Sequence, residues 1–239
     1  MACCPSDPDA GYATPAAMVF SLALALVGVA MVGRSLALMR LVRADLARTQ
    51  AEYALDGAHL AAAAAIVRST RPGPYRWTLP TEDGWTEITA AAEADKLSLD
   101  AASRLEDQAF AALGVTDPEV LRGKLTAASG QPGYPDIRPL EAGRLWRTCA
   151  PEFASAYGRQ ASFTYAAPVE PGLGSKPASW HIGEAWRITI TTSAGWRDAR
   201  IVRFTGDARH PAATVLRWLS RGGGVGGQCE TVLKAVSAA

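Results

Sequence analysis

The sequence holds few of the residues that build most catalytic and metal sites. It has three histidines and four cysteines among 239 residues, and no histidine has a second histidine or a cysteine at the spacing of zinc ligands. The G-x-S-x-G, H-E-x-x-H and P-loop patterns are also absent. These absences argue against a zinc hydrolase, an α/β-hydrolase and a P-loop nucleotidase, and we expect no catalytic residues.

A surplus of positive charge is missing as well. The chain has 24 Lys and Arg residues against 23 Asp and Glu residues, a formal net charge of +1. A protein whose main partner is nucleic acid needs a clear basic surplus to neutralise phosphates. We therefore expect no nucleic-acid partner.

Charge of either sign is absent from residues 10–33. About 20 mostly apolar residues are enough to cross the hydrocarbon core of a membrane, roughly 30 Å thick. A cleavable secretory signal would begin with basic residues and end in a small-residue cleavage site. Residues 1–11 carry Asp7 and Asp9 but no Lys or Arg, and no cleavage box follows the apolar run. The pattern favours a membrane anchor that the protein keeps.

The apolar run continues directly into an amphipathic stretch. Leu36, Met39, Val42 and Leu46 recur at intervals of three and four, which is the spacing of one helical face. No proline interrupts residues 16–71, so we expect one helix of more than about 50 residues, roughly 80 Å long. Three arginines, at positions 34, 40 and 43, follow the apolar run. Taken alone, the positive-inside rule would put that end of the span in the cytoplasm.

A short polar leader ending in glycine, followed by these two helical halves, resembles the N-terminus of type IV pilin-like proteins. The resemblance implies that prepilin peptidase cuts between Gly11 and Tyr12 on the cytoplasmic side, leaving Tyr12 as a methylated N-terminus. Most members carry Glu at the fifth mature position, which is Ala16 here. The K-type minor pseudopilin of the type II secretion system lacks this Glu. A carboxylate in lipid is costly unless it is paired, and a subunit at the tip has no subunit above it to pair with.

Residues 96–125, 136–165 and 183–221 also resemble later segments of the K-type pseudopilin. The resemblance implies a single-pass inner-membrane protein with its head in the periplasm, opposite to the side that the arginines indicate. Its implied role is to initiate pseudopilus assembly at the tip and help drive protein export through the outer membrane. The implied partners are prepilin peptidase, the I-type and J-type minor pseudopilins and the pseudopilus.

The expected fold is α+β. A long pilin-type helix spans the membrane with its first half and packs on a small antiparallel sheet, and the head also contains an inserted short helical subdomain. Within the head, we expect two short extended runs within 85–99. We expect helices over 101–113, 119–128, 140–149 and 151–157, and strands over 162–166, 185–192, 199–204 and 214–219. The predicted organisation is a leader (1–11), a transmembrane and stalk helix (12–71), the start of a pilin-like head (72–95), the helical subdomain (96–160), a C-terminal antiparallel sheet (161–221) and a flexible tail (222–239).

Two further features of the head have alternative interpretations. An exported head would lie in an oxidising compartment, where Cys149 and Cys229 either form a disulfide or remain two free thiols. Four carboxylates close in sequence could offer oxygen ligands to calcium, although helix caps and a solvated face explain them as well, and we expect no cofactor. These carboxylates belong to Asp95, Asp100, Glu106 and Asp107.

Two other functions compete with the tip role. One is a pilin-like component of a type IV pilus or a DNA-uptake apparatus, which a basic groove on the head would favour. The other is an exported enzyme with a signal anchor, which would need carboxylates or histidines gathered in a deep pocket.

Overall fold

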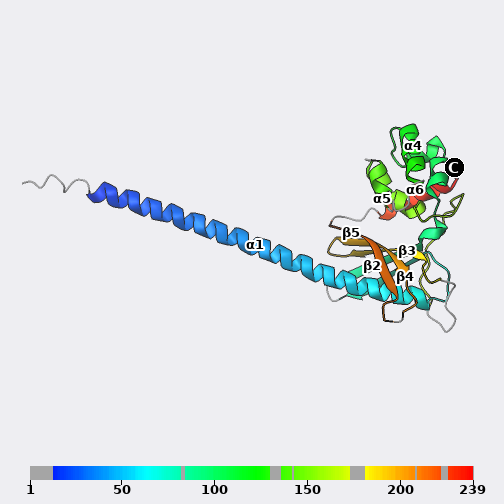
Figure 1. The fold of residues 1–239 in the computed structure, drawn as a ribbon. Helices are drawn as coiled ribbons and strands as arrows, with labels where there is room; N and C mark the ends of the chain where they lie inside the picture. Colours follow the sequence, from blue (N-terminus) through cyan, green and yellow to red (C-terminus); the bar gives the residue numbers. More distant parts are fainter. Residues whose placement is uncertain are drawn as a thin grey trace, which may run out of the picture. The chain divides into compact units, whose positions relative to one another are not determined.

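The computed structural model describes residues 13–81, 84–129, 136–141, 143–172, 181–207, 209–221 and 226–238, and the chain divides into two compact units, residues 1–53 and 54–239. Helix α1 (Ala13–Arg68) runs without a break from the first unit into the second, as Figure 1 shows in blue and cyan. The single long helix predicted from the sequence is therefore confirmed. It ends before Pro72, Gly73 and Pro74, residues that cannot continue a helix.

The second unit contains a five-stranded antiparallel sheet in which every strand pairs with its neighbour in sequence. The predicted strand over 185–192 is confirmed with the same bounds. The prediction of a strand over 162–166 is wrong, because the structure has no strand there. The sheet is also not confined to 161–221, since its first two strands precede the helical insertion. The strands are β1 (Tyr75–Thr81), β2 (Gly84–Ala92), β3 (Ala185–Thr192), β4 (Trp196–Phe204) and β5 (Ala212–Arg221).

One face of this sheet packs against the last turns of α1. Side chains alternate between the two faces of a strand, so Ile188 and Ile190 lie on the α1 face of β3 together with Ile88 of β2. On α1, Leu55 and Ile66 are almost completely buried. Each large apolar side chain buried in this way stabilises the fold by about 1.5–3 kcal/mol. The head is therefore built around the end of the long helix.

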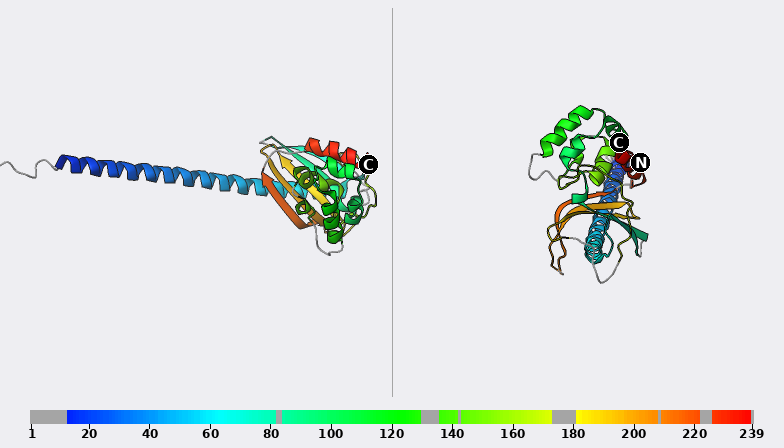
Figure 2. Two further views of the ribbon diagram at one scale, coloured as in Figure 1. Left: turned by 90° about the horizontal axis from the view of Figure 1, so that it is seen from above. Right: turned by 90° about the vertical axis from the view of Figure 1, so that its right-hand side faces the viewer.

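The other side of the sheet carries the helices inserted between β2 and β3, as Figure 2 shows. The predicted helix over 101–113 is two shorter helices, and the predicted helices over 140–149 and 151–157 are one helix that contains Pro151. Asp117 caps the N-terminus of α4 by accepting a hydrogen bond from the Val120 amide at 3.1 Å. The inserted elements are η1 (Glu93–Asp95), α2 (Leu99–Ser103), α3 (Asp107–Ala112), α4 (Pro118–Ser129), η2 (Arg138–Leu140) and α5 (Arg144–Phe153).

The prediction of a flexible tail over 222–239 is wrong for residues 226–238, which form helix α6 (Gly226–Ala238). Cys229, Val232, Leu233 and Val236 are buried against the inserted helices. Their spacing of three, four and seven residues places them on one helical face. The C-terminal segment thus completes the core of the helical subdomain.

Candidate functional site

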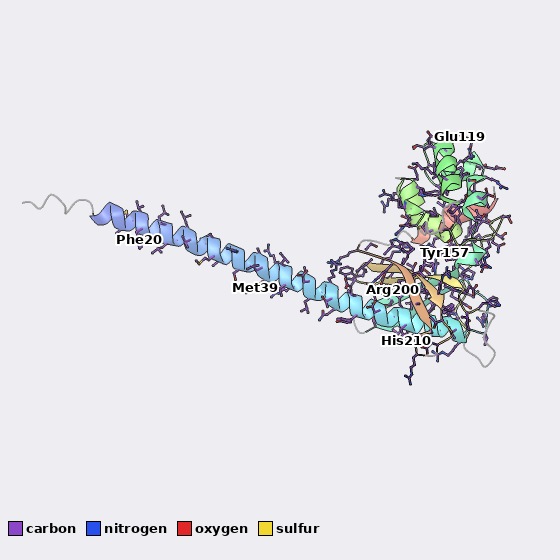
Figure 3. The ribbon with its side chains drawn as sticks, viewed as in Figure 1. Phe20, Met39, Glu119, Tyr157, Arg200 and His210 are labelled. Carbon is purple, nitrogen blue, oxygen red and sulfur yellow. A yellow bond between two sulfur atoms is a disulfide. The ribbon has the colours of Figure 1, made fainter. Side chains whose placement is uncertain are left out.

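The N-terminal part of α1 is long and apolar enough to cross a membrane. From Met18 onward its side chains are exposed, and Phe20 and Val29 are 66 % and 71 % exposed. Phe20 stands out from the helix in Figure 3. Soluble monomers rarely expose a continuous apolar surface of this extent, so this part of the helix is suited to lipid or to partner helices.

The next part of α1, up to Tyr53, combines exposed apolar and charged side chains. Leu38, Met39 and Leu41 are each more than half exposed, and Met39 is labelled in Figure 3. Arg48 donates a hydrogen bond to Glu52 one turn later at 2.9 Å. Apart from such local pairs, no other element among the described residues of the first unit covers this helical surface. It is the principal candidate surface for assembly with other helices.

A cluster of charged side chains joins the end of α1 to the sheet. Asp198 of β4 is completely buried and accepts hydrogen bonds from Arg200 at 2.6 Å and from Arg217 of β5 at 3.1 Å. On α1, Asp56 pairs with Arg200, and Nε2 of the buried His59 lies 3.5 Å from Asp198 Oδ2. Figure 3 labels Arg200 where α1 crosses the sheet.

The environment of Asp198 keeps its side chain ionised. Burial alone would raise the pKa of Asp198, but the adjacent His59 imidazole and the hydrogen bonds from Arg200 and Arg217 hold this pKa well below its usual range. An ionised, fully paired carboxylate of this kind fixes the orientation of α1 on the sheet, because any rotation of the helix would separate the partners.

A second buried cluster joins the sheet to the helical subdomain. Glu93 has no exposed surface and accepts hydrogen bonds from Lys96 at 2.5 Å, from Arg187 of β3 at 3.0 Å and from Ser155 after α5. The Lys96 ammonium also donates to the Pro151 carbonyl at 2.7 Å. Burial would raise the pKa of Glu93, but the two cations beside it lower that pKa to about 2.

A disulfide joins Cys149 of α5 to Cys229 of α6, with 5.1 Å between their Cα atoms. Of the two alternatives left by the sequence, a bridge or two free thiols, the structure has the bridge. The bond lies inside the apolar core of the helical subdomain, where both cysteines are buried. It holds α6 in place at the C-terminal end of the head.

Two of the four carboxylates considered as calcium ligands pair with arginines. Asp100 bonds to Arg104 at 2.5 Å, and Asp107 bonds to Arg122 at 2.6 Å. Among the residues that the structure describes, no three His, Cys, Asp or Glu side chains are grouped to hold a metal ion.

The predicted cleavage residues, Gly11 and Tyr12, lie outside the described residues. Ala16 lies in the first turn of α1, and only its backbone is described. No local pattern in the sequence indicates the clusters around Glu93 and Asp198, because each joins segments far apart in the chain, as Arg187 to Glu93 and His59 to Asp198. A local signal did exist for α6, in the helical spacing of its apolar residues.

Comparison of the chain with protein-family models, with curated proteins and with solved structures finds no match.

Proposed function

We propose that this protein is a minor pseudopilin of the K type, which initiates pseudopilus assembly at the tip of a type II secretion system. The observation that carries the proposal is the division of α1 into two parts. Its first half is apolar and exposed, while its last turns form the core of an α+β head. In this role the first half lies in the inner membrane and the head lies in the periplasm.

The role is structural and requires no catalytic residue. The exposed side chains between Arg34 and Tyr53 would pack against the helices of the I-type and J-type pseudopilins, which removes their apolar surface from water. The absence of a carboxylate at Ala16 suits the tip, where a buried carboxylate would have no partner amine. The helices inserted between β2 and β3 resemble the additional subdomain of the K type.

Processing by prepilin peptidase tests the pilin-like part of this proposal. We expect the full chain, co-expressed with the peptidase and extracted from the membrane, to have a mass that begins at Tyr12 with a methylated amine. Gly11→Val should block the cut, because a β-branched side chain would then precede the cleaved bond. Gly28→Val is the matched control, since a Cβ at Gly28 meets no atom within 4 Å. An uncut N-terminus in the unmodified protein would contradict the proposal.

The tip role has a separate test. We expect the processed protein to co-purify with an I-type and a J-type pseudopilin from the same membrane. Leu38→Asp, which places a charge on the exposed surface of α1, should weaken this association without changing the fold of the head, whereas Val120→Asp on α4 should leave it intact. Recovery of neither partner would remove the tip role, and retention of DNA at moderate salt would favour a DNA-uptake pilin instead.

A further inference from the structure

The head contains a cavity of about 610 Å³ on the face of the sheet that α1 does not cover. Its floor is formed by β2 and β3, and its walls include residues 163–168, α6 and the turn between β3 and β4. This volume lies within the range of roughly 300–1,000 Å³ that is usual for small-molecule sites. The cavity is separate from the exposed part of α1 on which the proposed assembly role depends.

The floor of the cavity is rich in hydroxyl groups. Thr89 of β2 lies opposite Thr189 of β3, and Glu87 lies opposite Thr191 in the same register. All four side chains line the cavity. The three threonine hydroxyls have no hydrogen-bond partner within the described part of the chain, although Thr189 is buried. Because buried polar groups are usually paired, these hydroxyls are suited to bonds with a ligand.

Aromatic side chains lie around this polar floor. Trp85, at the start of β2, is 45 % exposed, and Phe163 and Tyr165 are half-buried in the wall. An aromatic ring offers an apolar face on which the C–H face of a sugar ring can stack. Hydroxyls and carboxylates beside such a ring can then bond to the hydroxyls of the sugar.

The residues that line the cavity carry equal numbers of positive and negative charges. Four basic and four acidic residues line it, and two ion pairs among them are loose, with Arg76 3.5 Å from Glu87 and Arg197 3.8 Å from Glu152. These distances exceed the roughly 2.7–2.9 Å of a strong charge-assisted hydrogen bond, so both carboxylates keep capacity to accept further bonds. A balanced lining favours an uncharged ligand. The basic residues are Arg76, Lys96, Arg187 and Arg197, and the acidic ones are Glu87, Asp95, Glu152 and Glu230.

The position of the floor in the sheet argues against a peptide ligand. An extended peptide binds a sheet most readily by adding a strand to an open edge, where main-chain groups are free. Both β2 and β3 are inner strands that pair with a neighbour on each side. The groups that the floor offers to a ligand are therefore side chains, and most of these side chains carry a hydroxyl group.

From the hydroxyl-rich floor, the aromatic walls and the balanced charge, we propose that this cavity binds a short, uncharged oligosaccharide. The ligand would stack on Trp85 or Tyr165 and bond to Glu87 and to the threonines of β2 and β3. This site would serve recognition without catalysis, and it does not depend on the proposed assembly role.

The test uses the full chain in a detergent without a sugar headgroup, such as lauryldimethylamine oxide, since a maltoside detergent could occupy the cavity. Maltotetraose, cellotetraose, chitotetraose and xylotetraose are titrated separately, with heat and tryptophan fluorescence as readouts. We expect at least one to bind. Thr189→Val and Glu87→Gln should each weaken binding about tenfold, as expected for one lost hydrogen bond in a site.

Thr78→Val is the matched control, because Thr78 lies on the same face of the sheet in β1 but does not line the cavity. It should leave the affinity unchanged. Circular dichroism checks that each variant folds, and Glu87→Gln, on a partly exposed side chain, remains informative if Thr189→Val does not fold. The proposal is overturned if no tetrasaccharide binds at millimolar concentration, if a blocked Ala-Thr-Ala-Thr peptide binds instead, or if Thr78→Val weakens binding as much as the floor variants.

Discussion

Removing the charge of Glu93 should destabilise the head more than removing the charge of Lys96, although the two groups are bonded to each other. Glu93 is completely buried and bonds to two cations, Lys96 and Arg187. Glu93→Gln leaves these two cations buried and close together without the carboxylate that bonds to both. Lys96→Met leaves the pair of Glu93 and Arg187 intact, and the methionine replaces most of the volume of the lysine.

Two independent estimates give the size of the Glu93 effect. Breaking a buried ion pair by removing one partner costs about 3–5 kcal/mol. The pKa of Glu93 is lowered from 4.5 to about 2, and a difference of this size corresponds to about 3 kcal/mol of folding stability. For Lys96→Met we expect a smaller cost of about 2 kcal/mol, because the variant loses the two hydrogen bonds of the ammonium, to Glu93 and to the Pro151 carbonyl, at about 1 kcal/mol each.

The assay is urea unfolding of the full chain in detergent with the disulfide intact, followed by tryptophan fluorescence at pH 7 and at pH 3. Because the pKa of Glu93 is lower in the folded state, its stabilisation is complete above about pH 4.5 and is lost as the pH falls towards 2. The difference between the wild-type protein and Glu93→Gln should therefore shrink by about 2 kcal/mol between pH 7 and pH 3. Glu106→Gln, on an exposed side chain, is the control and should change stability little at either pH.

An equal or larger loss for Lys96→Met than for Glu93→Gln would refute this reasoning. It would mean that Arg187 does not neutralise Glu93 and that the cluster depends on the lysine. A difference that stays constant between pH 7 and pH 3 would show that folding does not lower the pKa of Glu93.

The charged cluster around Asp198, which joins α1 to the sheet, and the disulfide give two further predictions. Asp198→Asn should cost about 3–5 kcal/mol, because it removes the buried carboxylate that bonds to the buried Arg200 and leaves that arginine only the half-exposed Asp56 as a partner. Asp207→Asn in an exposed turn should have little effect, and urea unfolding distinguishes the two variants. Replacing both Cys149 and Cys229 by Ser should destabilise the head by about 2–4 kcal/mol. Amide hydrogen exchange should increase first in α6, and unchanged exchange there would contradict the view that the disulfide tethers this helix.

The sequence predicted those elements whose pattern is local and strongly periodic. Strand β3 was found with its full bounds because Trp186, Ile188 and Ile190 alternate with polar residues. The long helix was found because no proline interrupts it. Strand β1 was not predicted, although Tyr75, Trp77 and Leu79 also alternate with polar residues. Pro80 follows these residues, and a proline usually argues against a strand; β1 tolerates it because β1 lies at the edge of the sheet.

Other features depend on contacts between distant segments. Helix α6 begins with two glycines, Gly226 and Gly227, which alone indicate a flexible segment, and it is held by the disulfide and by apolar packing. Glu93 and Arg187 are separated by 94 residues in sequence, so no local pattern could pair them. The floor of the cavity likewise exists only once β2 and β3 lie side by side.

The bridge between Cys149 and Cys229, which lie 80 residues apart in sequence, closes a covalent ring that contains strands β3, β4 and β5. A mechanical force applied at the two ends of the oxidised chain cannot lengthen this ring. Reduction would release roughly 280 Å of additional contour length, which an optical trap would register as a longer extension at the same force. The last three strands are therefore shielded from tension for as long as the sulfur atoms stay joined.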